Sequence, residues 1–416
     1  MKEKSKTRAL TVLWAAAGLN FLTGILYIWS ILSKALITDF HWSSKEASLP
    51  YTMATISFVI FMMIFGRLQD TKGPRFTATF SATLMGVGLI LSGFATNPLL
   101  MLISFGVLTG AGIGIGSIST MPPAVKWFPP EKKGFVTGIV VAGVGASSIF
   151  FAPVTNVLLN AVGVSRSFII NGVAVLLLGL IFASLLRNPP AGYIAPSQSR
   201  TEKKQQTPVG FAKDLTTKDM LKTANFYKLW LMLAFSSSAG LMMIGHAANI
   251  ARIQVNWEGG YLLVALLAIF NALGRFLGGT VSDRIGRINL MRIIFSLQAI
   301  NMLLFGSYQS VAMLAFGVSL AGLNYGATFS VYPATVVDFY GVKNVGANYS
   351  VLFTGWGVAG IIGPMTAAAI FDATQSYNSA YLVAFGLLVV SILITFTFSR
   401  KSIELNTQLK GRMFKS

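Results

Sequence analysis

The chain has 416 residues, of which 54% are hydrophobic and only 11% are charged, and its formal net charge is +19. A soluble domain carries about 25% charged residues, so this composition excludes an ordinary soluble enzyme and indicates a membrane protein with many spans. The chain has no cysteine, which excludes disulfides and thiolate metal sites.

Twelve apolar segments are long enough to cross a bilayer as helices. We predict them at about 10–38, 47–68, 76–96, 98–121, 134–161, 165–187, 226–251, 258–281, 290–308, 310–337, 345–371 and 377–399. The polar stretch 188–225 is predicted to be a cytoplasmic linker with a short helix near 213–222. The sequence therefore predicts an all-α membrane protein, with one six-helix bundle at 1–187 and a second at 226–416 that ends in a short cytoplasmic tail.

Most of the 32 Lys and Arg residues lie at the two termini or in every second predicted loop. Basic residues concentrate in cytoplasmic loops of membrane proteins, so we expect both termini to lie in the cytoplasm. The positive charge is thereby explained by topology and contact with the lipid bilayer, and we expect no binding to nucleic acid.

One loop motif occurs twice, after the second and after the eighth predicted span. It reads G-x-x-x-D-x-x-G followed by arginine, and its residues are Gly66, Asp70, Gly73 and Arg75, then Gly279, Asp283, Gly286 and Arg287. Two six-helix halves in parallel repeat are typical of transporters with a central site. We interpret each copy as a conformational latch, in which nearby arginines can pair with the aspartate and the glycines allow a tight turn.

With these features the chain resembles the major facilitator superfamily over essentially its whole length. It further resembles the bacterial oxalate/formate antiporter family and the monocarboxylate (lactate/pyruvate) porters. That closer resemblance rests on YIWSILSKAL at 27–36, KWFPPEKKGFVTGIVVAG at 126–143, SAGLMMIGHAANIA at 238–251 and NALGRFLGG at 271–279. It implies twelve transmembrane helices in two six-helix pseudo-repeats and a location in the bacterial inner membrane.

Arg275 lies in the middle of the predicted span at 258–281. A permanent charge at this depth is costly and is tolerated only where it faces protein interior or a water-filled path. No acidic residue lies within the core of a predicted span, and a guanidinium can bind a carboxylate bidentately. We therefore expect Arg275 to bind an anionic substrate, which is also the role that the resemblance implies for the arginine of span eight.

Four further residues are candidates for the substrate site. Asn271 lies one helical turn before Arg275 on the same face. The monocarboxylate porters have an aspartate there that is implicated in proton coupling, whereas a neutral amide can orient the substrate but cannot take up a proton. Tyr27 fits an aromatic pocket wall, and the resemblance places Tyr332 and Trp356 among pocket aromatics. Lipid contact or ordinary packing is the alternative for the last two.

Two residues are candidates for proton coupling. Lys34 lies in the outer part of the first span, where a desolvated lysine can lose its proton or can instead extend its amine to the membrane interface. His246 is the only histidine within a predicted span. Histidine titrates near physiological pH, although a hydrogen-bonded packing role is an alternative.

The predicted function is secondary transport of small monocarboxylates by alternating access, coupled to protons as a symport. The oxalate antiporter that the chain resembles has a second basic residue in span eleven, where this chain has Ala359 or a close neighbour, so a monoanion is favoured over a dianion. A carboxylate exchanger of the oxalate:formate type remains the alternative. We expect no enzyme activity, cofactor or metal, and a monomeric protein.

Overall fold

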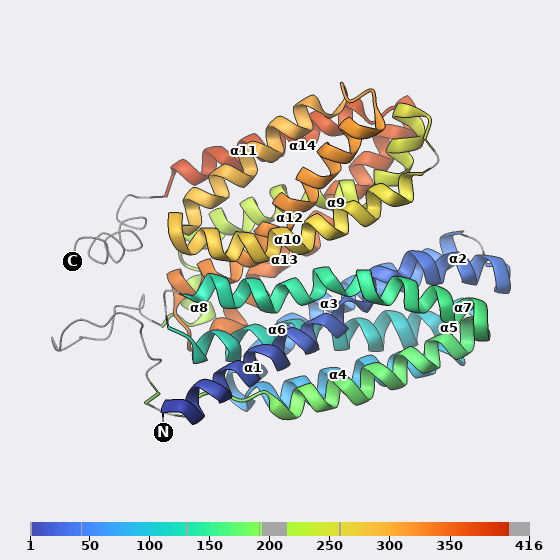
Figure 1. The fold of residues 1–416 in the computed structure, drawn as a ribbon. Coiled ribbons are helices and arrows are strands. Elements are labelled where there is room, and N and C mark those ends of the chain that lie inside the picture. Colours follow the sequence, from blue (N-terminus) through green and yellow to red (C-terminus); the bar gives the residue numbers. More distant parts are fainter. Residues whose placement is uncertain are drawn as a thin grey trace. The chain divides into compact units, whose positions relative to one another are not determined.

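The computed structural model describes residues 2–42, 44–129, 132–190, 192–193, 214–257 and 259–398, and the regular secondary structure of these ranges is helical (Figure 1). Eleven of the described helical segments are long and apolar enough to cross a membrane. One of them, α7 (Lys133–Leu185), consists of two helices that meet at Gly163, where φ is 79°. With α7 counted as two, the described chain contains the twelve predicted spans.

The first six spans are formed by the helices of the N-terminal half of the sequence. These are α1 (Lys2–Thr23), η1 (Gly24–Ile28), α2 (Trp29–Phe40), α3 (Ser44–Lys72), α4 (Pro74–Ser92), α5 (Pro98–Met101), η2 (Leu102–Thr109), α6 (Gly110–Trp127) and α7. The segment η1 is a 3₁₀-helix and η2 is a π-helix. Span one is therefore three consecutive segments, in place of the single predicted helix.

The remaining spans follow the linker. They are formed by α9 (Ala224–Val255), α10 (Gly260–Ile285), α11 (Arg287–Phe305), α12 (Val311–Tyr340), α13 (Val345–Thr374) and α14 (Asn378–Phe396). The short helix predicted near 213–222 corresponds to α8 (Thr217–Met220), which begins where the Thr216 side chain accepts a hydrogen bond from the Asp219 amide. Much of the predicted linker, including 194–213, lies outside the described residues.

The chain divides into two compact units. The N-terminal unit contains Met1–Pro130, Ile139–Gly210 and Val342–Val351, and the C-terminal unit contains Glu131–Gly138, Phe211–Gly341 and Leu352–Ser416. The predicted halves 1–187 and 226–416 each form most of one unit. Each half also gives one short segment to the other unit, and these two segments are the starts of α7 and α13.

The internal repeat of the sequence is also a repeat of helix packing. Gly110 and Gly114 of α6 lie against the backbone of α3, and Gly322 and Gly326 of α12 lie against the backbone of α10. The second pair follows the first by 212 residues. A Cβ atom at any of these positions would overlap the facing helix backbone, so the glycines set how closely the helices approach.

Candidate functional site

Arg275 lies on α10 and is buried, with 2% of its surface exposed. Its Nε atom donates a hydrogen bond of 2.9 Å to Oδ1 of Asn271, the residue predicted to lie one turn before it. Its guanidinium carbon lies 4.6 Å from the centre of the Phe329 ring. A neutral acceptor and an aromatic face are thus among the groups that hold the side chain.

The Phe329 ring that contacts this arginine belongs to an aromatic cluster on α12 and α13. The Phe329 ring lies 4.9 Å from Tyr325 and 5.9 Å from Phe353. Trp356 stacks on Phe353 at 5.1 Å and donates a 2.8 Å hydrogen bond from Nε1 to the Tyr325 hydroxyl. Trp356, which the sequence identified, therefore belongs to the cluster beside Arg275. Tyr325, Phe329 and Phe353 were missed, because their spacing on the helices does not show which face is turned to the arginine.

Small residues bring α12 against the turn that carries Arg275. Gly326 lies directly against the carbonyl of Asn271, and Gly274 lies against the carbonyl of Leu323. The Ser330 hydroxyl donates a hydrogen bond to the Arg275 carbonyl. These contacts fix the backbone of α10 at Arg275, so the charge is presented by a rigid helix pair.

Tyr332 and Tyr27 lie in other surroundings. The Tyr332 side chain is buried, and its hydroxyl faces Ser236 of α9 without a hydrogen bond of good geometry. Tyr332 therefore faces α9, whereas Phe329, on the same helix, lies over the guanidinium of Arg275. Tyr27 belongs to η1 of the N-terminal unit and is half-buried.

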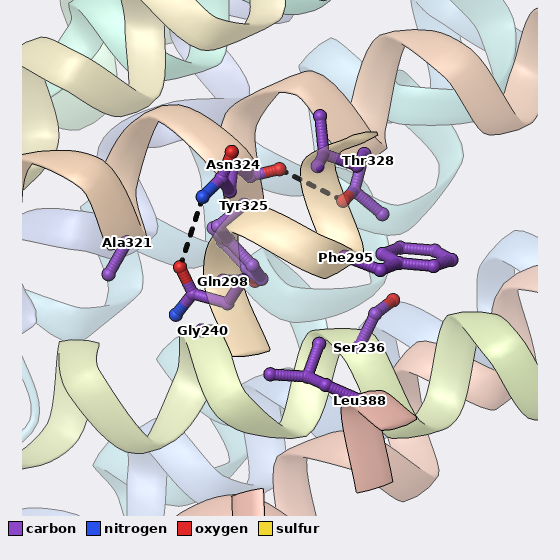
Figure 2. Close-up of a pocket in the computed structure, with 10 residues that line it drawn as sticks. Ser236, Gly240, Phe295, Gln298, Ala321, Asn324, Tyr325, Thr328 and Leu388 are labelled. Atoms are coloured by element: carbon purple, nitrogen blue, oxygen red, sulfur yellow. Dashed lines mark hydrogen bonds between the residues drawn. The ribbon is translucent and has the colours of Figure 1, made fainter. Parts of the chain in front are cut away.

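A small cavity of about 10 Å³ lies inside the C-terminal unit between α9, α11, α12 and α14 (Figure 2). The Asn324 amide donates to Oε1 of Gln298 at 3.2 Å. Two other groups in the lining, Nε2 of Gln298 and the Ser236 hydroxyl, have no hydrogen-bond partner among the described residues. This volume is enough for about one water molecule, which could pair with an unmatched donor.

We expect Asn324→Leu to lower the stability of the protein by about 1–3 kcal/mol, because Oε1 of Gln298 would lose its donor in a buried environment. Thermal unfolding of the purified protein measures this change. Ser319→Ala is the matched control on α12, since that hydroxyl bonds only the carbonyl one turn earlier. The double variant Asn324→Leu/Gln298→Leu should recover most of the loss, and a purely additive double variant would contradict the pairing.

His246 is half-buried on α9, and both of its ring nitrogens have partners. Nε2 lies 3.1 Å from the carbonyl oxygen of Pro364, which can only accept, so Nε2 carries a proton. Nδ1 lies 3.1 Å from the Tyr377 hydroxyl, which also accepts a 2.7 Å hydrogen bond from Asn249. Burial raises the pKa of Tyr377, so the phenol keeps its proton and can donate it to neutral His246.

Lys34, the other proton-coupling candidate, belongs to α2, but its side chain lies outside what the structure describes. In the described residues no group of three or more His, Cys, Asp or Glu side chains could hold a metal ion.

The second copy of the loop motif forms a network of four charged side chains. Oδ1 and Oδ2 of Asp283 accept hydrogen bonds of 3.0 and 2.8 Å from the amides of Gly134 and Phe135 at the start of α7. Arg287 lies 2.7 Å from Asp283 and 2.9 Å from Asp338, and Lys133 lies 3.4 Å from Asp338. The arginine predicted to pair with Asp283 does so, and the sequence did not indicate Asp338 or Lys133.

The first copy has the same helix contact without the arginine. Asp70 accepts hydrogen bonds of 3.1 and 2.9 Å from the amides of Gly346 and Ala347 at the start of α13. Arg75 is exposed and is absent from the ion pairs of the described residues. Arg75 therefore does not pair with Asp70 in this structure. In the register that aligns Asp70 with Asp283, Pro74 takes the place of Arg287, and Arg75 lies one residue further along α4.

The glycines of the motif adopt the backbone that their positions require. Gly73 and Gly286, each immediately before the next helix, have φ of 85° and 92°. This region is open to glycine and strained for other residues. Both copies therefore use the same turn, which places the aspartate at the end of one helix and starts the next helix directly.

Comparison with known proteins agrees with this architecture. The family model described as Major Facilitator Superfamily matches residues 13–300 and 241–413. The chain is 26% identical over 385 residues to the oxalate:formate antiporter of Oxalobacter formigenes, covering 91% of this chain and 88% of that one. It is 24% identical over 350 residues to monocarboxylate transporter 13 of Rattus norvegicus, covering 82% and 78%.

A solved structure of the fucose:proton symporter of E. coli has the same fold, with a TM-score of 0.68, 13% identity, and coverage of 92% of this chain and 98% of that chain. The family match spans nearly the whole sequence, and the twelve apolar helices repeat as two sets of six. The chain is a multi-pass membrane transporter of the Major Facilitator Superfamily.

Proposed function

We propose that this transporter moves small monocarboxylates, of the lactate or pyruvate kind, together with a proton through the bacterial inner membrane, with both termini in the cytoplasm. The observation that carries the proposal is the buried guanidinium of Arg275, whose Nε atom donates a hydrogen bond to the neutral amide of Asn271. A buried permanent cation is costly in a membrane span and favours binding of a carboxylate, which a guanidinium can hold through two hydrogen bonds.

The chemistry of the cluster favours a small substrate with one negative charge. Phe329, Phe353 and Trp356 offer apolar surface beside the guanidinium, which suits a short carbon chain. Ala359, near the place of the second basic residue in the oxalate antiporter that the chain resembles, is buried and uncharged. At this position the second charge of a dianion would meet an apolar side chain in place of a basic one.

A proton symport requires a group that takes up a proton, and His246 is the described candidate. Protonation would turn Nδ1 into a donor toward the Tyr377 hydroxyl, which already accepts from Asn249. The hydroxyl proton would then need another acceptor, so protonation rearranges the hydrogen bonds among α9, α13 and Tyr377. Lys34 is the second candidate.

Tyr377→Phe separates these two candidates. We expect it to shift the pH dependence of uptake if His246 carries the proton, because the variant removes the only hydroxyl that pairs with Nδ1. Initial uptake rates between about pH 5 and 8, where histidine titrates, measure this shift. Tyr308→Phe is the matched control, since its hydroxyl bonds Asn301 and not a titratable group. An unchanged pH profile in Tyr377→Phe would favour Lys34.

We further propose that both motif copies act as conformational latches. The carboxylates of Asp70 and Asp283 each bind the first amides of a helix that is distant in the sequence, a position where a negative charge is favourable. Such contacts can be lost and remade without unfolding any helix, which suits alternating access.

Exchange of carboxylates is the second candidate function, and the 26% identity to the oxalate:formate antiporter favours it. Proteoliposome uptake of labelled lactate, formate and oxalate distinguishes the two. Accumulation of a monocarboxylate that follows an imposed inward proton gradient and stops with an uncoupler supports symport. Uptake that needs a carboxylate preloaded inside the vesicles and ignores the gradient supports exchange.

A further inference from the structure

A groove on the N-terminal unit combines two basic side chains with two exposed aromatic rings. The residues that line it are Lys72, Arg75, Phe76, Thr79, Phe80 and Thr83. Five of the six belong to α4, and Lys72 is the last residue of α3. The lining contains no acidic side chain, so the groove has a positive end and an apolar end.

The positive end exists because the two copies of the loop motif differ. In the second copy Arg287 is neutralised by Asp283 and Asp338. In the first copy Pro74 takes the place of Arg287, and Arg75 lies one residue further along the chain. The residue that lies 212 positions before Asp338 is Lys126, so the first copy also lacks the corresponding acid. Arg75 is accordingly exposed at the groove, outside any ion pair of the described residues. Its charge is left available for a ligand.

The groove is held in shape by contacts between α3 and α4. The Thr77 hydroxyl donates a hydrogen bond to the side-chain oxygen of Gln69, and the Phe80 ring stacks on Phe65 at 5.2 Å. Helix α4 starts at Pro74 after Gly73, which gives no side-chain cap. The positive end of the α4 dipole therefore adds to the two basic side chains.

The apolar end continues along the outer face of α4. Phe76, Phe80, Val87 and Leu91 are 50%, 42%, 37% and 45% exposed, and they recur at helical spacing on one candidate membrane span. From Arg75 to Leu91 this stripe extends about 24 Å along the helix. A ligand that fills the groove needs an anionic group at one end and a long hydrocarbon chain at the other.

We propose that this groove binds an anionic phospholipid, with its phosphate between Lys72 and Arg75 and one acyl chain along Phe76 and Phe80. The positive end lies in a predicted cytoplasmic loop, at the level where lipid phosphates meet the membrane surface. A free phosphate ion would satisfy the charges and leave the aromatic stripe without a partner, so the lipid is the ligand that matches both ends.

The test is native mass spectrometry of the delipidated full-length transporter, titrated with phosphatidylglycerol or with zwitterionic phosphatidylcholine. We expect a phosphatidylglycerol adduct that phosphatidylcholine does not reproduce. A juxtamembrane basic residue contributes about 1 kcal/mol to anionic-lipid binding, which is about a fivefold change in affinity. Lys72→Gln/Arg75→Gln should therefore weaken binding by about 30-fold, and glycerol phosphate without acyl chains should not compete.

The matched control is Lys218→Gln/Arg284→Gln, which removes two exposed positive charges of predicted cytoplasmic segments that do not line the groove. It should bind phosphatidylglycerol as the wild type does. Wild-type affinity in Lys72→Gln/Arg75→Gln, or an equal loss in the control, would overturn the site in favour of diffuse charge attraction. Competition by glycerol phosphate would overturn the lipid in favour of a soluble phosphate.

Discussion

Arg275→Lys is expected to lower the efficiency of carboxylate uptake by about 100-fold while the protein stays folded. Lysine also carries a positive charge, so the site still holds a buried cation. It loses the planar fork that can bind a carboxylate through two hydrogen bonds and the flat face that lies on Phe329. Loss of one hydrogen bond to a charged group costs about 1.5–3 kcal/mol, and the upper end of this range corresponds to the expected change of about 100-fold.

Initial uptake rates in proteoliposomes, at several substrate concentrations, measure the effect of Arg275→Lys. Arg252→Lys is the matched control, because Arg252 is exposed on α9 and donates a hydrogen bond to the neutral side chain of Asn249. Size-exclusion chromatography of both variants reports whether they are folded. Wild-type uptake by Arg275→Gln, which lacks the charge altogether, would show that the substrate carboxylate does not bind this residue.

Asn271 refines the same test. Its Oδ1 atom accepts a hydrogen bond from Nε of Arg275 and so helps to orient the guanidinium. Asn271→Leu should therefore reduce uptake less than Arg275→Lys does, since it releases the orientation of the guanidinium but leaves its charge in place.

The elements of this fold could be predicted from the sequence because they depend on local features. Apolar runs of sufficient length gave the spans, and Gly73 and Gly286 marked two turns that require positive φ. The pair Asn271 and Arg275 could be predicted because residues four apart share a helical face. Each of these features is encoded within a few neighbouring residues.

Contacts between distant helices could not be predicted in the same way. Phe329 lies over Arg275 and Tyr332 does not, although both are aromatic residues of α12. The two motif copies look equivalent in sequence, yet only the second reaches an acid on another helix, Asp338. Rotation of each helix about its axis, which packing decides, selects among such partners.

Asp338→Asn is expected to destabilise the C-terminal unit by about 3–5 kcal/mol, the cost of removing one partner from a buried charge pair. Lys133, Arg287, Asp283 and Asp338 form a network with two positive and two negative charges, and at most 14% of any of these side chains is exposed. Without the Asp338 charge, two cations share the one carboxylate of Asp283. Thermal unfolding of the purified protein measures the loss.

Lys133→Met supplies the decisive comparison. Combined with Asp338→Asn, it removes one charge of each sign and leaves Arg287 with Asp283, so the double variant should recover much of the stability lost by Asp338→Asn alone. Asp219→Asn is the control for loss of an ion pair as such, because Asp219 and Lys222 are 50% and 77% exposed and such pairs contribute little. If Asp338→Asn were as mild as Asp219→Asn, or if Lys133→Met added to its effect, the charges would not act as one balanced network. Under the proposed latch function, neutralising either acid of the second copy would unbalance its network, whereas in the first copy Asp70 binds two helix amides.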